Sequence, residues 1–216
     1  MKILFLPSKY TASCSLKNIK PNKLPETIGL ITTIQHTNSL EKIKAFLEKH
    51  KKKVIIGKSK FLEKGQILGC NVKAAISIQD KVQAFLYIGS GKFHPLQLAL
   101  ATNKPIYIYN PLTNQFSKLK TEDINKAKAR KKGQKLKFLS AQTYGILVSI
   151  KPGQNKLKQA MELKKKLEKQ KKKAYIFTFD TLDINQLENF PKIQCWINTA
   201  CPGLSLEQPF VWYQDF

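Results

Sequence analysis

The chain has 216 residues, which is enough for one large domain or two small ones. Its hydrophobic content of 42% is ordinary for a globular protein, and no stretch approaches the ~18 consecutive apolar residues of a membrane span. The formal net charge of +24 favours acidic partners. Sequence-specific recognition of nucleic acid is not expected, because it relies on bidentate contacts from arginine and the chain has a single arginine, Arg130.

Predicted strands and helices alternate along the chain, which is typical of an α/β fold. Residues 1–7 are too short for a signal peptide and have no small-residue cleavage site, so we expect a cytoplasmic protein without a membrane partner. In chain order, the first half begins with predicted strands at 2–6 and 28–34, a helix from Leu40 and a strand at 54–56. A strand at 84–89, a helix at 96–102, a strand at 104–111 and a basic helix at 121–139 follow. The second half continues with a strand at 144–150, a helix from Leu157 and a strand at 174–179.

The sequence contains an internal repeat. Residues 46–54 resemble residues 166–174. In both places the segment follows one strand-like run, at 28–34 or 144–150, and precedes another, at 54–56 or 174–179, with a helix between the two runs. Each copy therefore reads as a β-α-β unit with a parallel sheet and a right-handed crossover. We place the boundary between two similar domains near residue 140.

Apolar stripes at helical spacing predict which face of each crossover helix is buried. Ser39 is expected to cap the first helix. The stripe residues are Leu40, Ile43, Phe46 and Leu47 in the first helix and Leu157, Ala160, Met161 and Leu167 in the second.

Two of the four cysteines are candidate metal ligands. Cys70 and Cys201 are each expected just past a strand end, at equivalent places in the two halves, where their thiolates could bind iron or zinc. A buried, purely structural thiol is the alternative for each. Cys195 is expected to pack within a strand, and Cys14, in a polar stretch, is the spare thiol.

Loops after predicted strands form a second group of candidates. Gly89-Ser90-Gly91 lies between a strand and a helix and could present backbone N–H groups to a phosphate, a carboxylate or a ribose, with His94 as a further donor. Gln35 follows the strand at 28–34, and Lys151-Pro152-Gly153-Gln154 has the same place in the second unit. Open α/β sheets bind ligands on this side, although each loop could equally be a plain turn.

Several segments, in order along the chain, resemble the diphthamide synthase family, the archaeal 2-(3-amino-3-carboxypropyl)histidine synthase. The matching segments are residues 30–36 (Leu-Ile-Thr-Thr-Ile-Gln-His), 65–71 (Gly-Gln-Ile-Leu-Gly-Cys-Asn), 88–95 (Ile-Gly-Ser-Gly-Lys-Phe-His-Pro), 148–154 (Val-Ser-Ile-Lys-Pro-Gly-Gln) and 200–202 (Ala-Cys-Pro). The resemblance implies three similar α/β domains, each giving one cysteine to a [4Fe–4S] cluster. That cluster binds S-adenosyl-L-methionine and generates a 3-amino-3-carboxypropyl radical, which is transferred to a histidine of translation elongation factor 2.

By this resemblance Cys70 and Cys201 are cluster ligands, and the cosubstrate pocket is lined by Gln35, Gly89, Ser90, Gly91, His94, Gly153 and Gln154. The chain departs from the family in two respects. The first of the three domains is absent apart from its last strand, so residues 1–24 are a remnant strand and linker, 25–139 the middle domain and 140–216 the C-terminal domain. The family's Cys-Pro-Arg reads Cys-Pro-Gly at 201–203.

We therefore expect part of a split enzyme, active when a separately encoded first domain supplies the third cysteine, in a homo- or hetero-oligomer. Two alternatives remain open. One is a catalytically silent scaffold subunit of that enzyme, and the other is a basic RNA- or ribosome-binding α/β module.

Overall fold

A computed structural model describes residues 4, 6–11 and 14–215. The chain separates into two compact units, residues 1–125 and 126–216, and the division falls inside the long helix α4 (Thr121–Ser140). The boundary predicted near residue 140 lies at the carboxyl end of α4, whereas the division between the two units falls near the amino end of this helix. Each unit is described by itself below.

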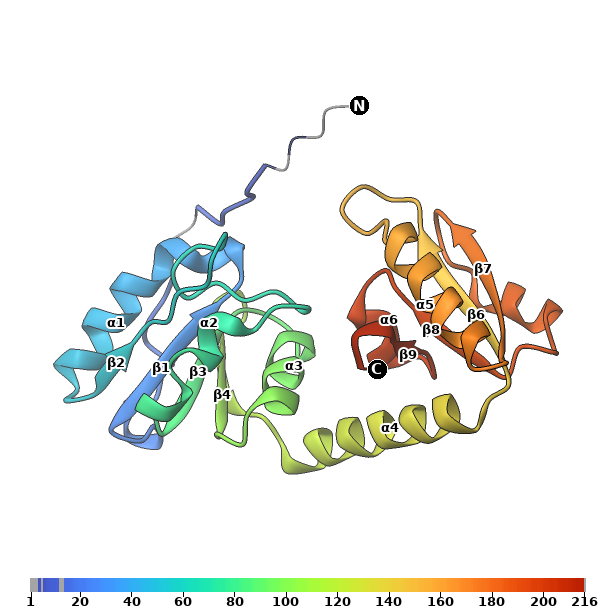
Figure 1. Ribbon diagram of the computed structural model, residues 1–216. Coiled ribbons are helices and arrows are strands. Elements are labelled where there is room, and N and C mark those ends of the chain that lie inside the picture. Colours follow the sequence, from blue (N-terminus) through green and yellow to red (C-terminus); the bar gives the residue numbers. More distant parts are fainter. Residues whose placement is uncertain (1–3, 5, 12–13, 216) are drawn as a thin grey trace. The chain divides into compact units, whose positions relative to one another are not determined.

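The first unit is built around a five-stranded sheet in the order β2-β1-β3-β4-β5. Its strands are β1 (Thr27–Thr32), β2 (Lys53–Ile55), β3 (Ala84–Ile88), β4 (Ile106–Asn110) and β5 (Gln115–Lys118). The first four run parallel and β5 is antiparallel to β4. The helices are α1 (Leu40–Lys49), α2 (Lys73–Ile76) and α3 (Phe93–Ala101), with 3-10 turns at Pro21–Lys23, Ile34–Ser39 and Gln79–Lys81 (Figure 1).

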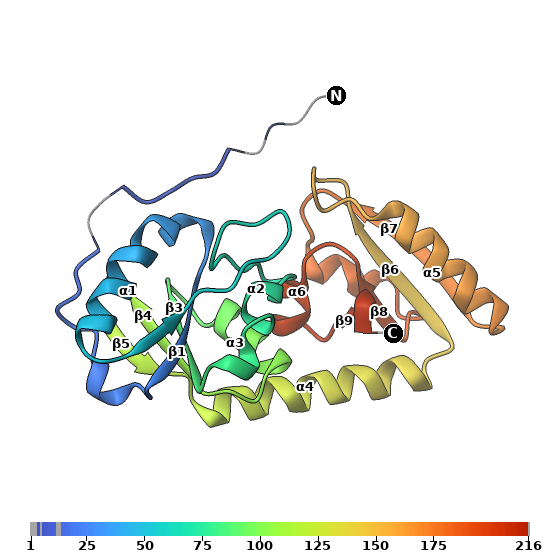
Figure 2. The same ribbon diagram turned by 60° about the vertical axis from the view of Figure 1, so that its left-hand side comes forward.

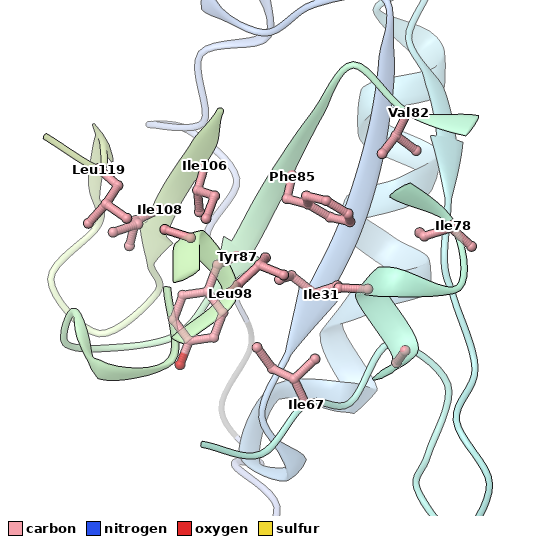
Figure 3. Packing of buried hydrophobic residues seen from close by; sticks show 13 residues of the cluster. Ile31, Ile67, Ile78, Val82, Phe85, Tyr87, Leu98, Ile106, Ile108 and Leu119 are labelled. Carbon is pink, nitrogen blue, oxygen red and sulfur yellow. The ribbon is translucent and has the colours of Figure 1, made fainter. Parts of the chain in front are cut away.

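Helices cover both faces of this sheet. On one face, α1 contributes Leu40, Ile43 and Leu47 to a cluster with residues of β1 and β3. On the other face, α2 and α3 pack against the same strands, as Figures 2 and 3 show. Every residue of β3 is buried, as expected of a central parallel strand that is covered on both sides.

The second unit repeats the arrangement on a smaller scale. Its strands are β6 (Thr143–Ser149), β7 (Lys173–Phe179), β8 (Cys195–Asn198) and β9 (Val211–Trp212), all parallel in the order β7-β6-β8-β9. Its helices are α5 (Leu157–Lys169) and α6 (Pro202–Glu207), with 3-10 turns at Ile184–Asn189 and Tyr213–Asp215. The order β7-β6-β8 matches β2-β1-β3, so the predicted fold class, two similar parallel β-α-β domains, is confirmed.

Two details of the predicted helices are wrong. Ser39 has helical backbone angles at the end of a 3-10 turn and makes no side-chain capping bond, so α1 continues a preceding turn. In α5, Leu157 and Met161 are 42% and 49% exposed. Leu163 packs against the core instead, because it shares the i, i+3, i+7 face of Ala160 and Leu167.

The strand predicted at 2–6 falls largely on residues outside the described ones. Leu4 and Leu6, which are described, have no regular secondary structure and are 81% and 79% exposed. No helix within the described ranges is long and apolar enough to cross a membrane.

Candidate functional site

The carboxyl ends of the parallel strands in the first unit bring three loops together at one edge of the sheet. The turn after β1 carries Gln35, the loop after β3 carries Ser90, and the exit from β4 carries Leu112. Ligands bind at this edge in open α/β sheets. The edge encloses a cavity of about 240 Å³, lined by Tyr10, Thr33, Gln35, His36, Tyr87, Ser90, His94 and Leu112.

Three of the sequence-predicted residues meet in this cavity: Gln35, Ser90 and His94. Gly89 and Gly91 flank Ser90 in backbone conformations that favour glycine, with φ of 151° and 70°. A Cβ on Gly89 would lie 2.6 Å from the Tyr87 hydroxyl oxygen. The glycines therefore allow the loop to turn tightly beside Tyr87.

Tyr87 and His94 form a polar pair beneath that loop. The Tyr87 hydroxyl lies 3.5 Å from Nδ1 of His94, and the two rings are stacked with centroids 6.0 Å apart. Burial raises the pKa of Tyr87 to about 12, although a hydrogen bond with Thr33 acts in the opposite direction. Burial lowers the pKa of His94. At neutral pH both groups are uncharged and can exchange hydrogen bonds with a bound molecule.

Sequence reasoning did not assign Tyr10 or Tyr87 to the site. Tyr10 comes from an irregular stretch, yet its backbone N–H donates to the Gln35 carbonyl oxygen at 2.8 Å and its ring lies 5.8 Å from that of His36. No sequence pattern near Tyr10 indicates this contact. Tyr87 belongs to a wholly buried strand, and Figure 3 places its ring among the core side chains with its hydroxyl at the edge of the cluster.

Cys70 is exposed in a tight turn near the end of β1. The preceding segment extends the sheet, because the Thr32 N–H donates to Gly65 at 2.9 Å and the Ile67 N–H donates back to Thr32 at 2.8 Å. Reciprocal bonds between Leu68 and Asn71, of 2.9 and 3.0 Å, then close the turn around Cys70. The thiol is thus held at the same carboxyl edge as the cavity.

Cys201 is partly exposed between β8 and α6, immediately before Pro202. The Asn198 side chain holds this turn: its Nδ2 donates to the Cys201 carbonyl oxygen at 2.5 Å and its Oδ1 accepts from the Ala200 N–H at 2.9 Å. Asn198 Nδ2 also lies 3.2 Å from Ser205 Oγ. The Cys201 turn is therefore fixed from both sides by one buried amide.

The predicted equivalence of Cys70 and Cys201 is wrong at the level of topology. Cys70 lies between β2 and β3, whereas Cys201 follows β8, the counterpart of β3. The misreading arises because residues 66–71 form isolated bridges to β1 and to one another instead of a full strand.

The other two cysteines are buried. Burial raises the pKa of the Cys14 thiol, and it raises that of Cys195 to about 11, so both favour the protonated form. Cys70 and Cys201 are the accessible thiols, and thiolate sulfur is a donor that iron accepts. Among the described residues, no group of three or more His, Cys, Asp and Glu gathers to hold a metal ion.

Gly153 and Gln154 lie in the second unit, in an exposed turn after β6. The Gln154 N–H donates to the Lys151 carbonyl oxygen at 3.1 Å, and Gly153 adopts a φ of 79°. The lining of the 240 Å³ cavity comes from the first unit and does not include them.

Comparison with known proteins gives consistent matches. The family model of diphthamide synthesis proteins matches residues 1–216. The 2-(3-amino-3-carboxypropyl)histidine synthase of Pyrococcus horikoshii is 35% identical over 192 residues, covering 88% of this chain and 54% of the relative. That of Methanocaldococcus jannaschii is 32% identical over 180 residues, covering 78% and 51%. Eukaryotic subunits match as well, so the similarity is not confined to archaea.

Among solved structures, the crystal structure of Dph2 from Pyrococcus horikoshii with a 4Fe-4S cluster matches with a TM-score of 0.75 and 33% identity. The match covers 90% of this chain and 57% of that one. The chain spans about half the length of the curated relatives it matches.

Proposed function

This chain belongs to the diphthamide synthesis family, and from that premise we propose that it is part of a 2-(3-amino-3-carboxypropyl)histidine synthase. The proposed reaction transfers a 3-amino-3-carboxypropyl group from S-adenosyl-L-methionine to a histidine of translation elongation factor 2. The observation that carries the proposal is the division of the four cysteines. The two in family-like motifs, Cys70 and Cys201, are accessible at loops beyond strand ends, and the other two are buried.

Cys70 and Cys201 would be two ligands of a [4Fe–4S] cluster. The donor set fits, since iron–sulfur clusters are held by cysteine thiolates and both thiols are accessible. When bound, the cluster would supply the electron that cleaves the cosubstrate. We propose that the third thiolate comes from a separately encoded first domain, because Cys14 and Cys195 are buried in their own units.

The cavity of the first unit would bind the cosubstrate. Ser90 and the glycines beside it would present hydroxyl and backbone N–H groups, and Gln35 would offer an amide. The partly buried, neutral imidazole of His94, next to Tyr87, would donate or accept one hydrogen bond without adding charge. Gly153 and Gln154 would contribute from the second unit, as the family resemblance implies.

The test is anaerobic reconstitution with iron and sulfide, read by metal and sulfide analysis and by electron paramagnetic resonance. We compare the wild type with Cys70→Ser and Cys201→Ser, and use Cys14→Ser as the control that removes a buried cysteine. We expect the reducible cluster signal to be lost in the first two variants and kept in the control. Unchanged cluster content in both Cys70→Ser and Cys201→Ser would refute the ligand assignment.

A transfer assay tests the activity. The reconstituted chain, alone and as material co-purified from the native cell, is incubated with reductant, elongation factor 2 and S-adenosyl-L-methionine labelled in the carboxypropyl group. Label on the elongation factor only in the presence of the co-purified protein supports the split enzyme. Label with the chain alone excludes the need for a separate first domain.

A catalytically silent scaffold is the second candidate. Gly203, the second residue of α6, stands where the family has arginine, so a cation beside the site is missing. If the chain is a silent scaffold, Cys70→Ser and Cys201→Ser leave the activity of the assembled complex unchanged. Tight, salt-sensitive RNA binding with no effect on transfer would instead favour a nucleic-acid-binding role.

A further inference from the structure

One loop of the first unit displays an aromatic side chain to solvent. Residues 57–65, which we call the Phe61 loop, leave the carboxyl end of β2 and return to the end of β1. The loop is closed at its base by the Gly65 N–H, which donates to the Gly57 carbonyl oxygen at 2.8 Å. It ends where Gly65 accepts a hydrogen bond from Thr32, at the carboxyl edge that also carries the cavity and Cys70.

The base of the loop is fixed by close backbone packing. A Cβ on Gly57 would lie 1.8 Å from the Ala74 carbonyl oxygen of α2. Gly65 has a φ of 74°, and a Cβ there would lie 2.5 Å from Leu40 Cδ1 of α1. One end of the loop therefore packs closely against α2 and the other against α1.

Polar contacts hold the body of the loop. Glu63 forms a 2.7 Å ion pair with Lys9, and its backbone N–H donates to Gln66 Oε1 at 2.9 Å. Lys64 pairs with Glu41 of α1 at 3.2 Å. The Ser59 residue is buried, and its carbonyl oxygen accepts from the Leu62 N–H at 3.3 Å. The loop is thus a defined structure that can present a side chain in a fixed direction.

Phe61 stands at the tip of this structure and is 92% exposed. Its φ of 69° lies in the left-handed region, which is unfavourable for a bulky L-residue. In the free chain the backbone conformation of Phe61 lowers the stability of the fold, and the exposed side chain buries no apolar area that would offset this cost. Strained, exposed residues of this kind cluster at sites that meet a ligand or a partner.

The lysines beside Phe61 indicate the chemistry of the surface that the loop would bind. Lys58 and Lys60 are exposed on the same loop, and Lys60 Nζ lies 5.1 Å from the Phe61 ring centroid. An aromatic anchor flanked by cations is complementary to an apolar pocket rimmed by carboxylates. We infer that the Phe61 loop docks the acidic surface of the protein substrate beside the cavity. This inference rests on the proposed function, which requires a protein substrate.

The experiment measures binding of the chain to elongation factor 2 by biolayer interferometry. Phe61→Ala removes the anchor and Phe61→Tyr keeps the ring. Tyr175→Ala, which removes a half-exposed aromatic side chain from β7 of the second unit, is the control for loss of a surface aromatic. We expect Phe61→Ala to raise the Kd about thirtyfold or more, which is the size of effect at an interface hot spot. Phe61→Tyr and Tyr175→Ala are expected to stay close to the wild type.

Two further variants separate docking from folding. Phe61→Gly relieves the backbone strain and is expected to raise Tm by about 2 °C while it weakens binding as Phe61→Ala does. Lys58→Ser with Lys60→Ser is expected to reduce the salt dependence of binding, whereas Phe61→Ala leaves that dependence unchanged.

Equal affinity of Phe61→Ala and the wild type overturns the inference and leaves the proposed function standing. No binding of elongation factor 2 by the wild type also overturns it. In that case the cluster reconstitution with Cys70→Ser and Cys201→Ser decides separately whether the proposed enzyme survives.

Discussion

Two histidines, the buried His36 and the partly buried His94, set the electrostatic character of the cavity. Burial lowers the pKa of both imidazoles from the ordinary value of 6.5. His36 packs against the Tyr10 ring and His94 against the rings of Tyr87 and Phe93. A charged imidazole in either place loses hydration without gaining a carboxylate, so the cavity favours neutral rings and uncharged hydrogen bonding at neutral pH.

We predict that this arrangement makes the first unit sensitive to mild acid. Because the pKa values of the two histidines are lower in the folded state, the unfolded chain binds protons first as the pH falls. The contribution of the two histidines to the free energy of unfolding is therefore complete above about pH 6.5. It is lost as the pH falls through their folded-state pKa values. The free energy of unfolding, measured by denaturant titration from about pH 8 to about pH 5, should therefore decrease over that range.

Glutamine variants assign the effect. His36→Gln and His94→Gln should each flatten the pH dependence, while His50→Gln, outside the cavity, is the control for removal of an imidazole. A pH profile that keeps its slope in the double variant His36→Gln with His94→Gln would contradict the assignment.

At the scale of elements, the Phe61 loop depends on the contact of Gly57 with α2. We predict that Gly57→Ala destabilises the first unit by about 2–3 kcal/mol, because the added methyl group meets a backbone carbonyl that cannot turn aside. Gly133→Ala is the matched control. It lies inside α4 with open space around its Cβ position, so the same substitution should stabilise the chain by about 0.5–1 kcal/mol.

Denaturant unfolding of the two glycine variants measures this difference. Hydrogen exchange should also show faster exchange in residues 57–65 of Gly57→Ala. Equal stability of Gly57→Ala and the wild type would mean that the loop base can shift, and the rigidity on which docking by Phe61 depends would be lost.

The elements that sequence reasoning predicted well are those with a local signal. The β-α-β repeats are predictable because the buried strands are short continuous apolar runs and the α1 stripe is periodic. The strands β1, β3 and β6 lie within a few residues of their predicted bounds. Ser39 was misread because the 3-10 turn before α1 leaves no periodic signature.

The candidate site was predicted only in part because its geometry is non-local. Gln35, Ser90 and His94 follow strand ends that the parallel sheet aligns, so topology alone brings them together. Tyr10 reaches the cavity through a backbone bond to Gln35, and Cys70 reaches the sheet edge through the bridge of Gln66 to β1. No short pattern in the sequence encodes contacts of these two kinds.

At the scale of the whole molecule, the excess of cations acts on both stability and recognition. The chain has 38 lysine and arginine residues against 14 aspartate and glutamate residues. Ion pairs such as Lys44 with Glu48 and Lys131 with Asp215 therefore use a small part of the positive charge. The remaining cationic side chains repel one another in the folded state, and they attract an acidic partner over a distance set by the ionic strength.

We predict that salt stabilises the free chain while it weakens binding of an acidic partner. The Tm of the free chain should rise as the ionic strength increases from about 0.01 M to about 1 M, since the Debye length shortens from about 30 Å to about 3 Å. Differential scanning calorimetry in sodium chloride measures this shift. A Tm that falls with salt would mean that favourable ion pairs outweigh the repulsion.

Lys128→Glu tests whether net charge is the cause. The substitution lowers the charge on the exposed face of α4 and places a carboxylate four residues before Lys132, a favourable helical pair. We expect a higher Tm at low salt and a smaller rise with added salt than in the wild type. Lys128→Gln separates the two causes, because it removes the cation without creating the pair and should give a smaller change in the same direction.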